Sequence, residues 1–295
     1  MHVCDLIERK SPFISLEFFP PKEREAWPGF FEVVEQLKAL NPLFASVTYG
    51  AGGGTQDNTL EIAARIKRDH GIEPITHLTS VGASAEKLEG FLNSLSEADI
   101  QNVLALRGDP PRGQEGFDFG SQEFRYATDV IEFINTRYPG MCVGGAAYPE
   151  PHPESPSIQF DIDMVHKKVE LGAKFLVTQL FFDNRLYFDY VERLRAMGSN
   201  VPVIPGVLPI MSLRSVKFIL GLCGAAIPGK YLTALEKAHE EGGDKAVYEL
   251  GMKYAVKQAK ELVEGGAPGV HLYTLNKAKA CLHIGNELNF KGVGA

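Results

Sequence analysis

Eight short β-rich runs alternate along the chain with segments of helical spacing. Most of the runs are nearly continuously apolar, as expected of parallel strands that are covered on both faces. Strand–helix alternation repeated eight times predicts an α/β fold of the (β/α)8 or TIM-barrel type. The runs are FISLEFF (13–19), FASVTYG (44–50), PITHLTS (74–80), NVLALRG (102–108), CVGGAAYP (142–149), FLVTQLFF (175–182), VPVIPGVLP (201–209) and GVHLYTLN (269–276).

The segments between these runs predict helices. Ser84 predicts the N-cap of one helix, and Asp183 with Asn184 that of another. The segment 227–266 is too long for one crossover helix, so we expect extra helices before the eighth strand. The clearest helical patterns cover residues 30–40, 58–69, 85–95, 125–137 and 164–172.

A doubly wound open sheet is the competing fold. That fold should carry a glycine fingerprint at its first strand–helix turn, and the turn FFPPK (18–22) contains no glycine. About 250 residues are typical of a TIM barrel. We therefore expect the 295 residues to form a single (β/α)8 catalytic domain, 1–295.

Composition excludes several functional classes. The net charge of −7 and the lack of a basic run argue against a nucleic-acid partner. No apolar stretch is long enough to cross a bilayer, and the N-terminus does not resemble a signal peptide, so we expect a cytoplasmic protein. The four cysteines are far apart and form no CxxC pair, which predicts reduced thiols and no metal site.

Polar residues stand where most of the predicted strands end. In a TIM barrel these ends converge on one mouth, where active sites lie. Each residue alone has a structural explanation: His77 could be a satisfied core histidine, and Arg107 and Asp109 could form an ion pair. Their occurrence at so many strand ends favours a functional site. The residues are Glu17, Thr48, His77, Arg107, Asp109, Tyr148, Gln179, Tyr273 and Asn276.

Glu17 is the residue of this set whose position is hardest to explain by structure alone. It lies in ISLEFFPPK (14–22), a run that otherwise reads as a buried strand ending at Pro20. An ionised carboxylate is almost never fully buried without a partner. Glu17 is therefore paired, or located at the wet end of the strand, or kept for chemistry.

Common catalytic motifs are absent from the sequence. There is no GxSxG, HExxH or GxxxxGK[ST] motif. The glycine-rich stretch YGAGGGTQ (49–56) is either a flexible turn or a place where the backbone approaches a ligand. His152 has no second histidine or cysteine at ligand spacing, so no metal is predicted there.

Eight motifs in order, about one per predicted strand, identify a family resemblance. They are LEFFPPK, SVTYGAGG, THLTS, LALRGDPP, GGAAYPEPHPES, TQLFFD, IPGVLP and HLYTLNKA. Together they closely resemble methylenetetrahydrofolate reductase of the bacterial type, which consists of the catalytic barrel only. The resemblance covers essentially the whole chain, and ALRGDPP and AAYPE are its most specific parts.

The resemblance implies an oxidoreductase of folate one-carbon metabolism with non-covalent FAD at the barrel mouth. NADH or NADPH reduces the flavin and leaves, and 5,10-methylenetetrahydrofolate then accepts the hydride to become 5-methyltetrahydrofolate, in a ping-pong cycle. Glu17 matches the general acid, for which a partly apolar mouth predicts a raised pKa. Asp109 matches the second catalytic residue, an aspartate close to the flavin and the pterin.

The other site residues follow from the same resemblance. Those matching cofactor contacts near the flavin ring and ribityl chain are Thr48, Tyr49, Ala51, His77, Arg107 and Gly108, together with Asp109. Tyr126, Ala127, Tyr148, His152 and Ser155 match positions that line the cofactor, and Asp161, Lys167 and Lys168 match the group that holds its ribose and diphosphate. Matches to the folate-binding residues are Glu17, Thr48, Asp109, Gln179, Tyr273 and Lys277.

Four positions depart from the pattern of the family. Lys277 stands where relatives often have arginine, which replaces a bidentate fork with a point charge. Met164 replaces a polar cofactor contact, Ser215 falls where some relatives have glutamine, and Ile219 where some have phenylalanine. A flavin-free branch exists, but the retained RGD motif and the Asp161, Lys167 and Lys168 set favour the FAD-dependent one.

Two alternatives and the partners complete the expectations. The chain could instead be the folate-reducing subunit of an electron-transfer complex, with a partner protein as electron donor. A non-catalytic folate-binding barrel is the weaker alternative, because it would give Glu17 and Asp109 no role. Otherwise we expect small-molecule substrates, no membrane or nucleic-acid partner, and a homo-oligomer.

Overall fold

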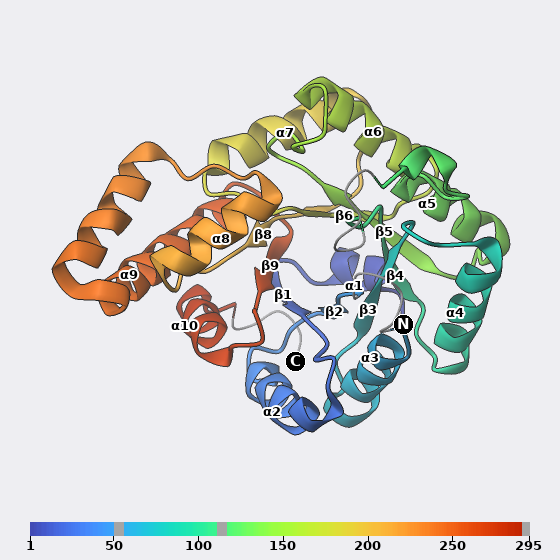
Figure 1. The fold of residues 1–295 in the computed structure, drawn as a ribbon, viewed down its shortest axis with the longest axis horizontal. Coiled ribbons are helices and arrows are strands. Elements are labelled where there is room, and N and C mark those ends of the chain that lie inside the picture. The colour runs from blue at the N-terminus through green and yellow to red at the C-terminus, as the bar shows by residue number, and fades with distance from the viewer. Residues whose placement is uncertain (50–55, 111–116, 291–295) are drawn as a thin grey trace.

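A computed structural model describes residues 1–49, 56–110 and 117–290. Within these residues, nine parallel strands form one sheet that curves into a nearly closed barrel, with helices around it (Figure 1). The predicted TIM-like α/β fold is therefore confirmed. The strands are β1 (Phe13–Phe18), β2 (Ala45–Val47), β3 (Pro74–Thr79), β4 (Asn102–Leu106), β5 (Cys142–Ala147), β6 (Phe175–Thr178), β7 (Val203–Ile204), β8 (Gly206–Val207) and β9 (Gly269–Tyr273).

The seventh predicted run closes the barrel as two short strands. β7 pairs with β6, and β8 pairs with β9, so that the run bridges the two edges of the sheet. Pro205 separates the two strands, and its carbonyl accepts a hydrogen bond from His271 N at 2.9 Å. Proline has no N–H to donate to a sheet, which explains why the run divides there.

The predicted helices form between the strands, most of them with boundaries shifted by one to three residues. α6 is the exception, because it begins six residues before the predicted start at Met164. Ser157 caps it and accepts a hydrogen bond from Phe160 N at 3.1 Å. The predicted caps Ser84 and Asp183 are confirmed at α4 and α7. The helices between the strands are α2 (Trp27–Lys38), α3 (Gln56–His70), α4 (Ala85–Glu97), α5 (Ala127–Arg137), α6 (Ile158–Glu170) and α7 (Asn184–Ala196), with 3-10 turns η1 (Arg24–Ala26) and η2 (Phe119–Ser121). A further helix that the sequence reasoning did not predict, α10 (Ala278–Leu288), follows the last strand.

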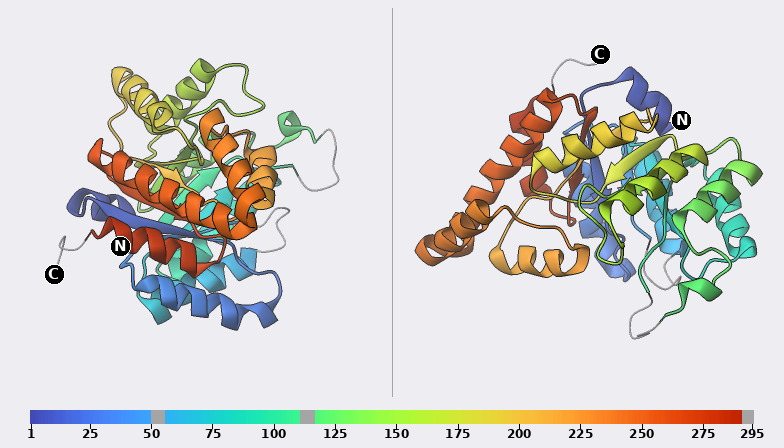
Figure 2. Two further views of the ribbon diagram at one scale, coloured as in Figure 1. Left: turned by 90° about the vertical axis from the view of Figure 1, so that its left-hand side faces the viewer. Right: turned by 90° about the horizontal axis from the view of Figure 1, so that it is seen from above.

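The expected extra helical segment before the last strand is also present. α8 (Leu213–Cys223) is followed by α9 (Gly229–Glu264), a long helix that bends at Gly243, where φ is 62°. Figures 1 and 2 show α8 and the first arm of α9 standing out from one side of the barrel. The second arm of α9 returns along the barrel and packs on α10. Among the described residues, no helix is both long and apolar enough to span a membrane.

Alternate residues of each strand face the two sides of the sheet. On β1, Ile14, Leu16 and Phe18 belong to the large apolar cluster that the strands share with the surrounding helices. Phe13 belongs instead to a second cluster that fills the N-terminal end of the barrel. This second cluster, here called the barrel floor, contains Phe13, Phe44, Ile75, Leu104, Cys142, Phe175, Val177 and Ile204, with Val3 and Ile7 of α1 (Val3–Arg9).

Helix α1 closes the floor, lying across the centre of the ring in the view of Figure 1. Val3 and Ile7 are buried there, and Val3 N donates to Asn102 Oδ1 of β4 at 2.8 Å. The N-terminal end of the barrel is thus sealed by apolar contacts and a satisfied polar anchor. The open end is the one at which the strands terminate.

Candidate functional site

A cavity of about 540 Å³ lies at the carboxyl ends of the strands. That size is in the range of small-molecule sites. Most of the polar residues that the sequence placed at the strand ends do meet here, because parallel strands in a barrel end on the same side. The predicted site residues that line the cavity are Glu17, Thr48, His77, Arg107, Gly108, Asp109, Tyr148, His152, Gln179 and Tyr273.

Glu17 lies at the inner end of this cavity and is only 6% exposed. In the sheet it pairs with Ser46 of β2 on one side and Tyr273 of β9 on the other. Its Oε2 lies 3.5 Å from Nε2 of His77 and 3.6 Å from Nε2 of His271, and Ser46 Oγ donates to it at 3.5 Å. The Glu17 carboxylate of β1 is therefore paired with buried polar groups and also lines the cavity.

His271 and Ser46 contact the Glu17 carboxylate, and the sequence reasoning selected neither. His271 is fully buried, and its Nδ1 lies 2.8 Å from Ser15 Oγ, while its Nε2 lies 3.3 Å from Ser46 Oγ. The alternation of side chains along a strand could have predicted His271, because this residue is two positions before Tyr273 and faces the same side of β9. Together Ser15, Ser46 and His271 form a polar layer between the floor and the mouth.

The pKa of Glu17 corrects an expectation. Burial, the largest influence, raises this pKa, but a hydrogen bond from His271 and the charges of His77 and His271 together lower it below its usual value of 4.5. Burial lowers the pKa of His77, against the opposing effect of Glu17. At neutral pH Glu17 is therefore ionised and His77 neutral in this structure, and the raised Glu17 pKa that was predicted from an apolar mouth is wrong.

The RGD turn forms one wall of the cavity. Gly108 has φ +83°, and a Cβ atom there would lie 2.9 Å from Cβ of Thr79, so the turn requires glycine. Arg107 pairs with Glu154, with 2.6 Å between Nη1 and Oε2, and not with Asp109 as the structural alternative supposed. The Asp109 side chain lies at the rim of the cavity, where it is exposed.

Two tyrosines and a glutamine complete the polar lining. The Tyr273 hydroxyl donates to the Thr178 carbonyl at 2.8 Å, and Gln179 Oε1 accepts from Leu180 N at 2.8 Å. The Tyr148 ring meets the His152 ring edge to face, with centroids 5.3 Å apart. Burial raises the pKa of Tyr148 to about 12, so this residue stays a neutral hydrogen-bonding group.

Comparison with known proteins places this chain in a family. The family model for methylenetetrahydrofolate reductase matches residues 2–289. The chain belongs to the methylenetetrahydrofolate reductase family. It is 37% identical over 300 residues to methylenetetrahydrofolate reductase (NADH) 1 of Arabidopsis thaliana, covering 96% of this chain and 50% of the relative. It is 34% identical over 279 residues to a probable methylenetetrahydrofolate reductase (NADPH) of Caenorhabditis elegans, covering 92% of this chain and 41% of the relative.

The chain thus spans about half the length of the curated relatives it matches. A solved structure shares the fold, with a TM-score of 0.63, 17% identity and 96% of each chain covered. That protein is an uncharacterized protein from Clostridium thermocellum that binds two copies of 5-methyl-5,6,7,8-tetrahydrofolic acid.

Other residues that the family resemblance selected lie outside the lining of this cavity. Lys168 is buried, and its Nζ donates to the Ala146 carbonyl at 2.7 Å and lies 5.7 Å from the centre of the Tyr148 ring. Burial lowers its pKa to about 8, with the charge of Asp161 opposing. Asp161 Oδ2 accepts from His152 N at 2.8 Å. In this structure both residues therefore support the wall formed by Tyr148 and His152.

The remaining predicted contacts that the structure describes do not line the cavity. Tyr126 is the exposed N-cap residue of α5, Ala127 is buried behind it, and Tyr49 packs edge to face on Phe91. Ser155 is half-buried, whereas Lys167 and Lys277 are exposed. Ala51 and most of the glycine-rich stretch lie outside the described residues. Their roles as FAD or folate contacts stay predictions.

Apolar residues also line the mouth, and the sequence reasoning selected only Ile219 among those named here. Phe218 of α8 is 68% exposed there, and Ile219, one of the departures from the family pattern, lies beside it. Ser212 caps α8 and could have revealed this helix from sequence, since it accepts a hydrogen bond from Ser215 N at 3.2 Å. The further unpredicted lining residues include Phe19, Leu208, Cys223 and Leu275.

Proposed function

We propose that the chain reduces 5,10-methylenetetrahydrofolate to 5-methyltetrahydrofolate, with FAD in the mouth cavity and NADH or NADPH as donor. The proposal assigns the whole reaction to one catalytic domain, residues 1–295. The observation that carries it is the place of Glu17, a buried carboxylate at the inner end of a ligand-sized cavity in a chain of this family.

The cavity residues fit a flavin. The mouth combines apolar walls with a few fixed polar groups, as flat cofactors require. Gly108 keeps one wall free of a side chain, and His77 Nε2 is buried without a hydrogen-bond partner among the described residues, although Glu17 lies 3.5 Å away. The chemistry that FAD supplies when bound is hydride transfer from the nicotinamide to the folate in a ping-pong cycle.

Several of the chain's residues would hold this cofactor. We assign the flavin ring and ribityl chain to the strand-end residues of the cavity and to the stretch after β2. The outer part of the cofactor falls to the α5 and α6 regions. The assigned residues are Thr48, Tyr49, Ala51, His77, Arg107, Gly108, Asp109, Tyr148 and His152 for the inner part, and Tyr126, Ala127, Ser155, Asp161, Lys167 and Lys168 for the outer part.

Glu17 acts as the general acid in this proposal. The methylene bridge of the substrate opens only when its leaving nitrogen gains a proton. Because the lowered pKa keeps Glu17 ionised at neutral pH, this residue would have to take up a proton from solvent when a ligand covers the mouth and removes the remaining water. Burial is already the largest influence on its pKa and raises it, so further exclusion of water acts in the required direction.

Asp109 and the folate-binding residues complete the assignment. The Asp109 carboxylate at the rim would stabilise the positive charge that develops on the opened folate. Gln179, held by its contact with Leu180, would hydrogen-bond the pterin, and Thr48 would contact the same ligand. Tyr273 and Lys277, at the end of β9, would face the aminobenzoate and glutamate part.

An anaerobic visible spectrum of the purified chain tests the proposal. NADH should bleach a flavin band, and methylenetetrahydrofolate should restore it. NADH could also leave the flavin band unchanged, while the folate restores the band after the flavin has been reduced chemically. That result would instead favour a partner protein as electron donor. The absence of a flavin band after FAD is added would contradict the cofactor assignment.

A further inference from the structure

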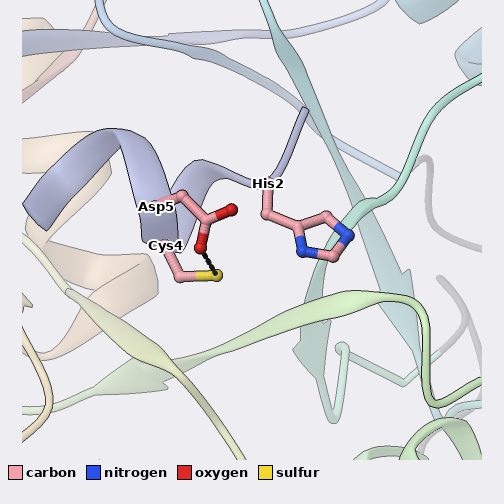
Figure 3. Close-up of side chains that lie close together, drawn as sticks. All are labelled: His2, Cys4 and Asp5. Carbon is pink, nitrogen blue, oxygen red and sulfur yellow. Dashed lines mark hydrogen bonds between the residues drawn. The ribbon is translucent and has the colours of Figure 1, made fainter. Parts of the chain in front are cut away.

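Three side chains of kinds that can bind metals lie close together in and beside α1, at the floor of the barrel (Figure 3). They are His2, Cys4 and Asp5, and one ligand atom from each lies within 4.8 Å of the other two. In the part of the chain that the structure describes, no other group of three His, Cys, Asp or Glu side chains is this close. We propose that His2, Cys4 and Asp5 bind a Zn²⁺ ion, or a similar borderline divalent cation.

The orientation of His2 suits a ligand. Its Nε2 lies 2.9 Å from the Gly140 carbonyl oxygen, which can only accept, so this nitrogen carries the proton. Nδ1 then has the free lone pair, and Figure 3 shows it turned toward Cys4 and Asp5. Metal-bound histidines commonly donate their other N–H to a backbone carbonyl in this way, which fixes the tautomer and the ring.

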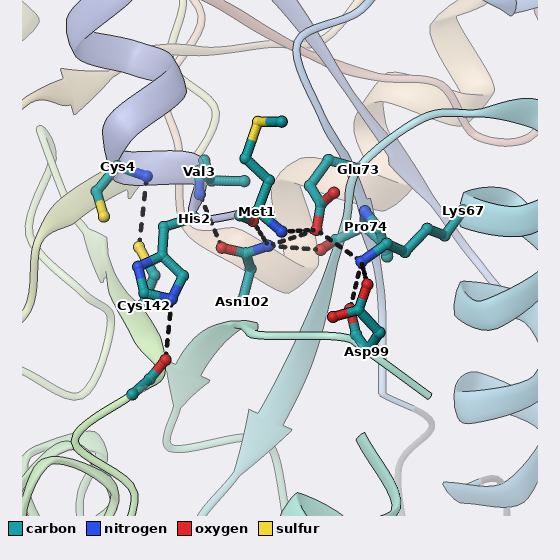
Figure 4. Close-up of polar contacts among 11 residues, drawn as sticks. Met1, His2, Val3, Cys4, Lys67, Glu73, Pro74, Asp99, Asn102 and Cys142 are labelled. Carbon is teal, nitrogen blue, oxygen red and sulfur yellow. Dashed lines mark hydrogen bonds and ion pairs between the residues drawn. The ribbon is translucent and has the colours of Figure 1, made fainter. Parts of the chain in front are cut away.

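The backbone that carries the three ligands is held by the barrel. Val3 N donates to Asn102 Oδ1 at 2.8 Å, and Asn102 Nδ2 donates to the Met1 carbonyl at 2.9 Å (Figure 4). The backbone N–H of Cys4 donates to Cys142 Sγ of β5 at 3.4 Å. The ligands are therefore positioned before any metal arrives, which lowers the entropic cost of binding.

The ligand chemistry selects the class of metal. A thiolate, an imidazole and a carboxylate match the preferences of Zn²⁺, with water in the fourth tetrahedral position. The Cys4 thiol now donates to Asp5 Oδ1, with 3.7 Å between sulfur and oxygen, and this proton would be released to solvent when the metal binds. The thiolate and the carboxylate then balance the two positive charges of the cation.

The expected consequence is structural and independent of the proposed folate chemistry. Cys4 and Asp5 belong to α1, whereas His2 is tied to the Gly140 carbonyl just before β5. A metal bound by all three would fasten α1 to the floor that it closes. Since the unfolded chain would not hold these ligands together, Zn²⁺ should raise the melting temperature.

The test uses the untagged full chain under anaerobic, reducing conditions, with Co²⁺ as a spectroscopic probe and Zn²⁺ in competition with a chromophoric chelator. We expect one metal per chain, a thiolate-to-Co²⁺ charge-transfer band and a Zn²⁺-dependent rise in melting temperature. Cys4→Ser should abolish the band. Asp5→Asn should lower Zn²⁺ affinity about tenfold or more, because even residues that only support ligands contribute that much.

Two matched variants serve as controls. Cys223→Ser removes another half-buried thiol and Glu8→Gln another acid of α1, and both should keep the band and the affinity. If Cys4→Ser does not fold, His2→Gln replaces it, since the His2 side chain makes no cap hydrogen bond to α1. The proposal is overturned if the wild-type chain binds no Co²⁺ or Zn²⁺, or if the Cys4, Asp5 and His2 variants bind as well as the wild type.

Discussion

The two ends of the barrel are built from the same strands, yet their inward-facing side chains differ in kind. β1 carries Phe13, Ser15 and Glu17 on alternate positions from the floor to the mouth. In and directly beside β2, Phe44, Ser46 and Thr48 follow in the same order. The inward-facing side chains therefore change from aromatic, to serine, to polar cavity-lining residues within a few positions. One strand thus contributes to the apolar floor at its start and to the lining of the cavity at its end.

Polar groups show the same contrast. At the floor the Asn102 amide donates to the Met1 carbonyl and to Glu73, and its oxygen accepts from Val3 N. At the mouth His77 Nε2 is buried without a hydrogen bond among the described residues. Unsatisfied buried groups cost stability unless a ligand pairs with them. The Asn102 anchor of the floor is thus satisfied by the chain itself, whereas His77 at the mouth leaves a nitrogen that a ligand could pair with.

Glu17→Gln should produce the largest effect, a loss of activity at the mouth without a loss of stability at the floor. Removing a general acid typically lowers the rate by about 100-fold to 10,000-fold. Turnover of methylenetetrahydrofolate should fall by that factor, while FAD stays bound and NADH still reduces it, as stopped-flow measurement of the two half-reactions would show. Glu25→Gln, which changes an exposed acid of η1, is the control. Folate reduction at the normal rate in the Glu17→Gln variant would disprove the assigned role.

Ile75→Ala should lower the stability of the floor and leave activity at the mouth unchanged. Ile75 is fully buried in the floor cluster, and truncating such a residue typically costs about 2–5 kcal/mol of stability. Denaturant unfolding should show this loss, with the turnover number of the folded enzyme preserved. Ile219→Ala, at the half-buried mouth position, should do the reverse and raise KM with little loss of stability. Similar stability losses in both variants would remove the distinction between the two ends.

Gly108→Ala should affect the mouth through the backbone. A Cβ atom would meet Thr79 at 2.9 Å in a left-handed conformation, and strain of that kind costs about 1–3 kcal/mol. We expect weaker FAD binding and a lower melting temperature. Gly82→Ala is the matched control, because Gly82 has φ +67° but has nothing within 4 Å of a Cβ. An equal effect in both variants would show that φ alone, and not the contact with Thr79, matters.

His77 should give the smallest effect, a pH dependence of stability that originates at the mouth. Its folded-state pKa lies below the usual 6.5, so the unfolded chain binds the proton first as the pH falls. Stability should therefore decrease as the pH drops below about 6.5. Glu17, with a folded-state pKa below 4.5, should add to the loss at still lower pH.

Melting temperatures between pH 4 and 7.5 would measure this slope. His77→Gln should flatten it between its folded-state pKa and 6.5, whereas His283→Gln, which changes an exposed histidine of α10, should leave it unchanged. An unchanged slope in the His77→Gln variant would mean that other groups control the acid sensitivity.

Local sequence determined the elements and most of the mouth. Continuous apolar runs became the strands, Ser84 and Asp183 capped the predicted helices, and polar residues such as Glu17, His77 and Gln179 met at one end of the barrel. These features depend on residues close in sequence, or on the rule that parallel strands in a barrel end together. The start of α6 and the division of the seventh run at Pro205 needed the structure.

Contacts between distant segments were decided by tertiary structure alone. Closure of the barrel brings His271 of β9 to Glu17 of β1, and this reverses the predicted direction of the Glu17 pKa shift. Gly140 likewise reaches His2, 138 residues away in sequence. Sequence patterns report periodicity along one segment, but electrostatic energies depend on distances between atoms, and those were set only when the strands took their register around the ring.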